Sequence, residues 1–322
     1  MISVPRIPSP EALILKVLPR IRSVKNLMVA ASLPDSSVTW LERSLTSSDV
    51  HVHTTRKPKG GYRTVCRPLD ETLLRLQKRL KEFIDRKVLD PHPDVHGFTR
   101  GRGTSTNAGA HLNARALLTV DITDFFPSIS RQQVEAALQA HGANPTIAES
   151  ITNVSTFGGT LATGFPTSPV LSNLVFRPLD DEFRSLAADN GLVYTRYADD
   201  LTFSGPSVGD EHLEVITGLL LSSGFHTNKR KVRFQRKGHQ QVVTGLAIAH
   251  SDHLRLPKAQ KKRLRQDLYF AGKHGLAAQA RYRNSDEAEL REQLLGRINY
   301  LMGVEHEVAL RMRREFDAID PF

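Results

Sequence analysis

Three aspartates of this chain stand beside short apolar segments, where their carboxylates can meet. Asp121 lies near the end of the apolar run 116–122, and Asp199 and Asp200 follow the run 192–197. Runs of this length and composition predict buried strands. Carboxylates gathered at one edge of a sheet repel one another unless divalent cations neutralise them. Their oxygens suit Mg2+, and two such ions, roughly 4 Å apart, stabilise the attacking and leaving oxygens of a phosphoryl transfer. We therefore predict a two-ion magnesium site at these three catalytic aspartates.

The tetrapeptide Tyr197-Ala198-Asp199-Asp200 is by itself ordinary turn sequence, because aspartate is common in hairpin turns. Four further motifs accompany it in a fixed order. They are Arg63 in a basic hairpin, Phe125-Phe126 after Asp121, Gly164-Phe165-Pro166-Thr167-Ser168-Pro169 with Asn173, and Asn228 with Lys231. This order and spacing resemble the reverse transcriptase family over about residues 55–250. The joint signal is strong although each part alone is weak.

Two shorter signatures narrow the resemblance. Asn107-Ala108-Gly109-Ala110-His111 and Val243-Thr244-Gly245 are similar to the NAxxH and VTG motifs of bacterial retron reverse transcriptases. Taken singly, they fit a loop asparagine, a satisfied histidine and a strand bulge. Together, inside the longer pattern, they favour the retron type.

The resemblance implies roles for residues around the nucleotide. Arg63, assisted by Arg56, Lys57 or Lys59, is expected to bind the triphosphate, because guanidinium makes bidentate contacts to phosphate oxygens. The alternative is an exposed basic hairpin. Phe126 falls beneath the sugar, where its ring would clash with a ribonucleotide 2′-OH. Lys231 falls near the leaving pyrophosphate, as a proton donor if its pKa is lowered. The carbonyl of Ile122 is a further predicted metal ligand.

One position departs from the family pattern. Many reverse transcriptases carry Gln before the glycine of the QGxxxSP motif, whereas this chain has Thr163 before Gly164. A threonine hydroxyl reaches less far than a glutamine amide. We expect Thr163 and Gly164 to border the nucleotide, with different contacts from those of a glutamine.

The charge balance points to a polyanionic partner. The chain has 44 Lys and Arg against 34 Asp and Glu, a net charge of +10, which attracts nucleic acid unless it is merely a solvated surface. The segment 255–283 is rich in Lys and Arg and holds one acid, Asp267. The predicted RNA-binding residues are Asn107, His111, Val243, Thr244, Gly245, Lys258, Lys261, Lys262, Arg263 and Arg265.

Other classes of site are excluded. The single cysteine, Cys66, rules out an internal disulfide or a cysteine-cluster metal site, and no HExxH pair occurs. No stretch of 18 apolar residues could cross a membrane, and the N-terminus lacks a signal peptide pattern, so we predict a cytoplasmic protein without membrane contact.

Periodicity predicts an α+β fold. A basic hairpin over 51–69 precedes a helix over 71–88, a loop over 90–109 and a helix over 134–141. The resemblance implies a right-hand polymerase fold with fingers, a palm of antiparallel sheet and helices, and a helical thumb. The expected divisions are a helical extension at 1–50, fingers and palm at 51–252 and a basic thumb at 253–322.

The function implied is that of a retron-type RNA-directed DNA polymerase, a nucleotidyltransferase using dNTPs. It would copy a cognate non-coding RNA of the msr-msd type from a guanosine 2′-OH, leaving branched RNA–DNA (msDNA). Expected partners are an accessory effector protein in anti-phage defence and a host RNase H, because the chain has no room for its own nuclease domain. The rivals are a group II intron-like or diversity-generating reverse transcriptase, and a non-catalytic RNA-binding scaffold that inhibits a toxin.

Overall fold

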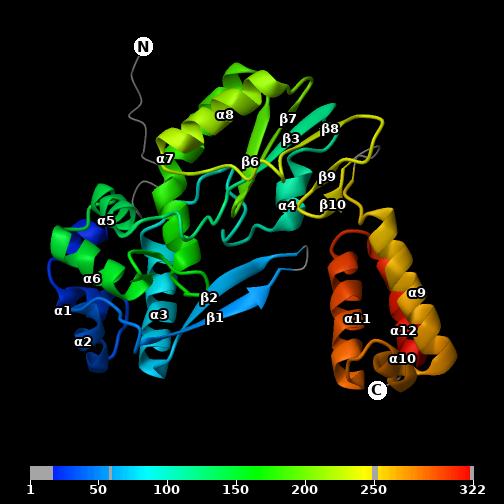
Figure 1. Ribbon diagram of the computed structural model, residues 1–322, viewed down its shortest axis with the longest axis horizontal. Coiled ribbons are helices and arrows are strands. Elements are labelled where there is room, and N and C mark those ends of the chain that lie inside the picture. Colours follow the sequence, from blue (N-terminus) through cyan, green and yellow to red (C-terminus); the bar gives the residue numbers. More distant parts are fainter. Residues whose placement is uncertain (1–16, 58–59, 249–252, 320–322) are drawn as a thin grey trace, which may run out of the picture.

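A four-stranded antiparallel sheet lies at the centre of the computed structural model, which describes residues 17–57, 60–248 and 253–319 (Figure 1). Its strand order is β6-β7-β3-β8. The strands are β3 (Ala116–Asp121), β6 (Val193–Tyr197), β7 (Asp200–Gly205) and β8 (Arg233–Arg236). Nearly every residue of β3 is buried, as expected for an apolar run without alternation. The strands predicted around the aspartates are confirmed.

Five of the helices share one hydrophobic core with the sheet. They are α3 (Glu71–Lys87), α5 (Arg131–Ala140), α6 (Pro145–Ser155), α7 (Ser168–Asp189) and α8 (Asp210–Ser222). Of these, α7 packs directly against the sheet. The predicted helix at 71–88 is confirmed, and its first amides at Thr72 and Leu73 donate to Asp70. The predicted helix at 134–141 begins earlier, at Arg131, because Ser130 and Gln133 form a capping box there.

A hairpin extends from this core beside α3 (Figure 1). Strands β1 (Val50–Arg56) and β2 (Tyr62–Pro68) pair antiparallel, with Arg56 opposite Tyr62. The predicted basic hairpin is confirmed. The region predicted as a loop over 90–109 contains a short helix, α4 (Thr104–Gly109). The Thr106 hydroxyl accepts from the Gly103 amide and closes its first turn, a local contact that composition does not reveal.

The helices before β1 belong to the same core. They include α1 (Val24–Ala30) and α2 (Val38–Leu41), whose Leu27 and Leu41 are fully buried in that core. Short strands β4 (Thr156–Phe157) and β5 (Thr160–Leu161) pair with each other near α6.

A second core gathers the C-terminal elements, the thumb helices α9–α12. These are α9 (Lys258–His274), α10 (Leu276–Tyr282), α11 (Glu287–Met302) and α12 (His306–Ile319). The core also contains hairpin β9 (Val242–Val243) and β10 (Leu246–Ala247), together with Ala108 and Leu117. The hairpin that precedes the predicted thumb boundary at 253 therefore shares its core with the thumb helices, and the boundary stays a prediction. No described helix is long and apolar enough to cross a membrane, and the predicted α+β class is confirmed.

Candidate active site

Strand pairing brings the three aspartates to one edge of the sheet. In the antiparallel register of β3 and β7, Asp121 lies opposite Asp200. The amide of Ile122 donates to the carbonyl of Asp199 at 2.9 Å, and the amide of Asn228 donates to the carbonyl of Asp121 at 2.8 Å. These backbone hydrogen bonds and strand pairs therefore fix the positions of the three aspartates in the sheet.

The carboxylates are partly removed from water and affect one another. Asp121 is buried, Asp199 is partly buried and Asp200 is exposed. Burial raises the pKa of Asp199, and the negative charge of Asp121 raises it further. The Lys231 ammonium donates to Asp121 Oδ1 at 2.6 Å. The cluster therefore has a positive group beside it.

The charge of Lys231 bears on its predicted role. Burial acts to lower the pKa of Lys231, but the hydrogen bond to Asp121 and the charges of Asp121, Asp199 and Asp200 outweigh it and raise that pKa. The sequence interpretation made Lys231 a proton donor on condition of a lowered pKa. That condition is not met, because the Lys231 ammonium lies against the Asp121 carboxylate and its pKa is raised.

The donor set fits hard divalent cations. Among the described residues, no group of three or more His, Cys, Asp or Glu side chains gathers around one point. Two mutually repelling carboxylates, Asp121 and Asp199, nevertheless lie close enough to shift a pKa, and a lysine ammonium supplies the counter-charge. Oxygen ligands with this need for positive charge suit Mg2+. The carbonyl of Ile122 as a ligand stays a prediction.

A buried ion pair supports the turn that holds Asp199. Arg196 and Asp180 are both fully buried, and the guanidinium donates to both carboxylate oxygens at 2.8 and 2.7 Å. The Tyr194 hydroxyl donates to the same carboxylate at 2.7 Å. Arg196 also lies over the Phe176 ring at 4.5 Å and donates to the Ala198 carbonyl at 3.2 Å. Ala198 has φ of +58°, a left-handed conformation that is unfavourable for alanine. Arg196 thus holds an otherwise strained turn.

The backbone segment after Val95, a residue that pairs with Arg196, packs against this turn. A Cβ on Gly97 would lie 2.3 Å from the Ala198 amide nitrogen, so any other residue would displace the turn. The Asn173 side chain donates to the Gly97 carbonyl at 3.1 Å. Asn173 therefore holds Gly97 in position, and Gly97 in turn packs against the turn that carries Asp199.

Two aromatic residues, Phe125 and Phe126, follow Asp121 in the chain. Phe125 is 5% exposed and packs on Phe176 and Phe225 in the core. Phe126 is partly exposed, and its ring centroid lies 5.9 Å from that of Phe98. Phe98 is 43% exposed with φ of +59°. Phe126 is therefore available to a ligand, while Phe125 is not.

The hairpin β1–β2 brings positive charge toward the aspartates. The charge of Lys57 acts to lower the pKa of Asp199, against the effect of burial. Arg63 is exposed on β2, with its Nε 3.3 Å from Thr55 Oγ1. Lys59, predicted to assist Arg63, lies outside the described residues.

The Thr163-Gly164 segment meets the hairpin. The Thr163 carbonyl accepts from the Cys66 amide at 2.7 Å. Gly164 has φ of +105°, and a Cβ there would lie 2.5 Å from the Cys66 carbonyl oxygen. Glycine is therefore required at 164 for β2 to approach, and the side chain of Thr163 is partly exposed.

The two NAxxH residues lie inside the protein. Asn107 and His111 are each 1% exposed, which contradicts the predicted direct contacts to RNA. His111 is held between β6 and β7, with Nε2 2.7 Å from Thr195 Oγ1 and Nδ1 2.6 Å from Ser204 Oγ. The structure supports the alternative of a satisfied histidine, because each ring nitrogen has a hydroxyl partner.

Burial lowers the pKa of His111 to about 3, with the charge of His96 contributing. In the unfolded chain this histidine has an ordinary pKa of about 6.5, so between about pH 6.5 and 3 it is protonated in the unfolded state and neutral in the folded state. Stability should therefore fall as pH drops from about 6.5 toward 3, by roughly 2 kcal/mol at pH 5. Urea unfolding at pH 7 and pH 5 measures this loss. His111→Gln should reduce the pH dependence, part of which remains because burial also lowers the pKa of His96, to about 4. His239→Gln, at an exposed site, should retain the full pH dependence; equal slopes in the two variants would contradict the assignment.

The VTG residues form the tight turn of hairpin β9–β10. Val243 is 1% exposed, which contradicts a direct RNA contact by its side chain. Thr244 and Gly245 have φ of +44° and +83°. The Thr244 hydroxyl donates to the Thr104 carbonyl at 3.0 Å, and the Thr104 and Tyr300 hydroxyls lie 3.1 Å apart. The signature therefore joins α4, β9–β10 and α11.

The predicted basic residues of α9 differ in their surroundings. Lys258, Lys262, Arg263 and Arg265 are exposed. Lys261 instead donates to both carboxylate oxygens of Glu305, at 2.9 and 2.7 Å, so its ammonium is engaged within the bundle and its RNA contact stays a prediction.

Comparisons with known proteins agree with this geometry. Residues 55–263 match the family described as Reverse transcriptase (RNA-dependent DNA polymerase). The chain is 33% identical over 280 residues to the retron Mx65 reverse transcriptase of Myxococcus xanthus, covering 80% of this chain and 62% of that protein. It is 30% identical over 223 residues to the retron Ec86 reverse transcriptase of Escherichia coli, covering 67% of this chain and 68% of that protein. The chain thus spans less than two thirds of the first relative's length.

A solved structure supports the fold. The telomerase from Candida albicans in complex with the TWJ fragment of telomeric RNA has a TM-score of 0.50 at 11% identity, covering 93% of this chain and 61% of that chain. At this identity the likeness concerns the fold alone, and it confirms the polymerase architecture expected from the sequence.

Proposed function

Because the chain belongs to the reverse transcriptase family, within its retron branch, we propose that it is an RNA-directed DNA polymerase that extends a primer with dNTPs. The observation that carries the proposal is the register that places Asp121 opposite Asp200, next to Asp199. Three oxygen-bearing side chains at one sheet edge are what in-line phosphoryl transfer requires, since that chemistry needs positioning and charge rather than a protein nucleophile.

Two Mg2+ ions held by Asp121, Asp199 and Asp200 would stabilise charge on the attacking and leaving oxygens. The protein's own residues orient the nucleotide. Arg63 and Lys57, on the hairpin, bind phosphate oxygens by charge-assisted hydrogen bonds. Lys231, which the neighbouring carboxylates keep protonated, would interact with the leaving pyrophosphate once its hydrogen bond to Asp121 is released.

Phe126 is proposed to select deoxyribonucleotides, because its ring would occupy the space of a 2′-OH. Phe126→Ala should raise ribonucleotide incorporation relative to dNTP incorporation by on the order of tenfold to 100-fold. Single-nucleotide extension with matched dNTP and rNTP measures the ratio of kcat/KM values.

The matched control is Phe98→Ala, which removes the adjacent ring. It should lower activity on both nucleotides without changing their ratio. A changed ratio in Phe98→Ala, with wild-type discrimination in Phe126→Ala, would assign the selection to Phe98.

The RNA partner proposed is a cognate structured non-coding RNA of the msr-msd type. Copying would begin when a guanosine 2′-OH of that RNA attacks the α-phosphate of a dNTP and releases pyrophosphate, leaving a 2′–5′ branch. The exposed Lys258, Lys262, Arg263 and Arg265 support phosphate contacts of this kind. We further propose action in the cytoplasm with a host RNase H and an accessory effector protein of anti-phage defence.

Coexpression with the neighbouring RNA locus tests this function. RNA that copurifies should carry DNA joined through a 2′–5′ linkage. A debranching enzyme, which cleaves 2′–5′ linkages, should separate this DNA from the RNA, whereas an enzyme that cleaves only 3′–5′ linkages should leave the branch intact. The same preparation with Asp199→Asn should contain the RNA without DNA. Only unbranched cDNA, or equal activity on unrelated RNAs, would instead indicate a group II intron-like or diversity-generating enzyme.

A further inference from the structure

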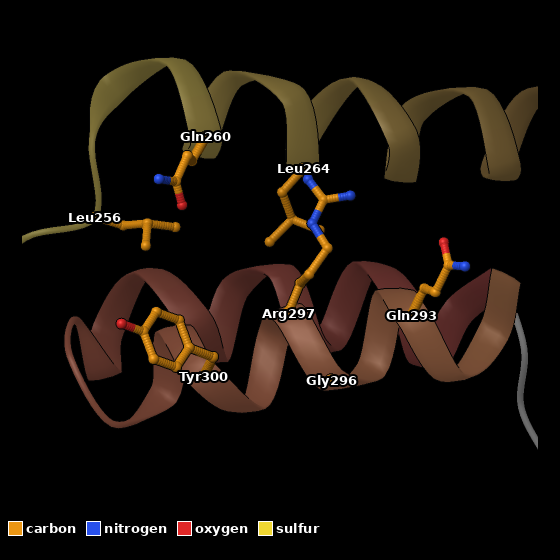
Figure 2. Close-up of a pocket in the computed structure, with 7 residues that line it drawn as sticks. All are labelled: Leu256, Gln260, Leu264, Gln293, Gly296, Arg297 and Tyr300. Atoms are coloured by element: carbon orange, nitrogen blue, oxygen red, sulfur yellow. The ribbon is translucent and has the colours of Figure 1, made fainter. Parts of the chain in front are cut away.

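The thumb helices carry two hollows of different chemistry. One, of about 320 Å3, lies between α9 and α11 and is lined by Leu256, Leu264 and Tyr300 among others (Figure 2). None of its described lining residues has a buried polar atom without a partner. The other, of about 890 Å3, lies between α9 and α10 and is called here the α9–α10 groove. In Figure 1, α9 lies on the side of the bundle away from hairpin β1–β2.

Aromatic rings in contact with water line the α9–α10 groove. Phe270 is 47% exposed and Tyr282 is 92% exposed, and both line it. The His274 ring stacks on Phe270 with an interplanar angle of 19° and extends the aromatic surface. Large apolar side chains left exposed together mark an interaction site more often than a bare surface.

A buried amide lies in the same groove without a full set of partners. Gln279 is 6% exposed, and its Oε1 is buried without a hydrogen-bond donor. Burying an acceptor without a donor is unfavourable, so such a group calls for a ligand or a functional reason. Ala259 and Ala278, whose side chains are small, also line the groove.

The charges of the α9–α10 groove are positive where they face water. Lys262 and Arg263 line it and are exposed. The acid in its lining, Asp267, is 3% exposed and is paired with both Arg283 and Arg297. A ligand therefore meets cations at the rim and no uncompensated carboxylate.

We propose that the α9–α10 groove binds an unpaired nucleotide of RNA, with its base against the Phe270 and Tyr282 rings. Gln279 Oε1 accepts from an amino or imino group on the base edge, and Lys262 and Arg263 contact the flanking phosphates. Stacking on aromatic rings beside a basic rim is the usual chemistry by which proteins hold single-stranded bases.

The proposal rests on the proposed function, because it names what part of the RNA the enzyme recognises. It adds something that phosphate contacts alone do not supply. Lysine and arginine on α9 attract any RNA, whereas a pocket for one extruded base distinguishes a bulged or looped RNA from a continuous duplex.

Binding of two RNA hairpins to the full chain tests the groove. The two hairpins are identical except that one of them carries a single additional, bulged 2-aminopurine nucleotide. The wild-type protein should bind the bulged hairpin about tenfold more tightly and quench its fluorescence by stacking. Phe270→Ala should remove both the preference and the quenching. Gln279→Leu should reduce the preference without lowering the melting temperature, since it removes a buried acceptor that has no donor.

Tyr269→Ala is the matched control, because Tyr269 is 62% exposed on the same helix and does not line the groove. It should keep the wild-type preference. Equal affinity for both hairpins, or equal losses in Phe270→Ala and Tyr269→Ala, would overturn the proposal. Extension of an annealed primer by the wild-type protein is measured separately. If the protein extends the primer but shows no preference for the bulged hairpin, the groove proposal alone is refuted. If it prefers the bulged hairpin but does not extend the primer, the proposed enzyme activity alone is refuted.

Discussion

Asp199→Asn is expected to reduce primer extension by about 1000-fold or more, while RNA affinity and folding stay near wild type. The substitution removes one negative charge from the metal-binding cluster, and the loss of several kcal/mol of transition-state stabilisation corresponds to a rate change of this order. Folding should not suffer, because burial and Asp121 already disfavour the ionised form of Asp199. Single-turnover extension of a primed RNA with Mg2+ measures the effect.

The matched control for this charge change is Asp189→Asn, at the exposed end of α7. It should extend the primer at the wild-type rate. Extension by Asp199→Asn within a few-fold of wild type would contradict the assignment of Asp199 as a catalytic ligand.

Asp180→Ala is expected to destabilise the protein by about 3–5 kcal/mol, because it leaves the fully buried Arg196 guanidinium without its carboxylate. Urea unfolding measures this loss. Tyr194→Phe, which removes one donor to the same carboxylate, should cost only about 1 kcal/mol.

A double variant separates stability from the position of the catalytic turn. Arg196→Met with Asp180→Leu replaces the ion pair by apolar groups, which commonly restores much of the stability lost on breaking such a pair. Extension should stay well below wild type, because the Ala198 carbonyl loses the donor that holds its left-handed turn. Wild-type extension in this double variant would show that the pair stabilises the core without positioning Asp199.

The sequence predicted those parts of the site that depend on local pattern. Apolar runs ending on aspartates predicted strands β3 and β6, and the helical spacing of leucines after Asp70 predicted α3. These signals are local because a strand or helix is built from neighbours in sequence. The register that sets Asp121 opposite Asp200 then follows from the pairing of β3 with β7.

Contacts between distant segments could not be predicted in the same way. An arginine before the Tyr-Ala-Asp-Asp turn looks like any polar strand residue, and its partner Asp180 lies on α7. Only the folded chain shows that the pair is buried. Residue type also misled the interpretation of His111, because a polar side chain of a motif can make interior hydrogen bonds as readily as contacts to RNA. Asn107 is buried as well, although its side-chain amide has no hydrogen-bond partner. Gly97 and Phe98 were likewise missed as neighbours of the site.

The six-residue helix α4 has a consequence for exchanging segments among relatives. Its Thr104 contacts both Thr244 and Tyr300, its Ala108 lies in the thumb core, and His111 just beyond it bonds to β6 and β7. A chimera cut at residue 253 would therefore place a foreign bundle against unmatched native surfaces. Recombinants that also carry the donor's 103–117 and 241–252 segments would keep those surfaces matched, so crossover points compatible with folding should cluster outside them.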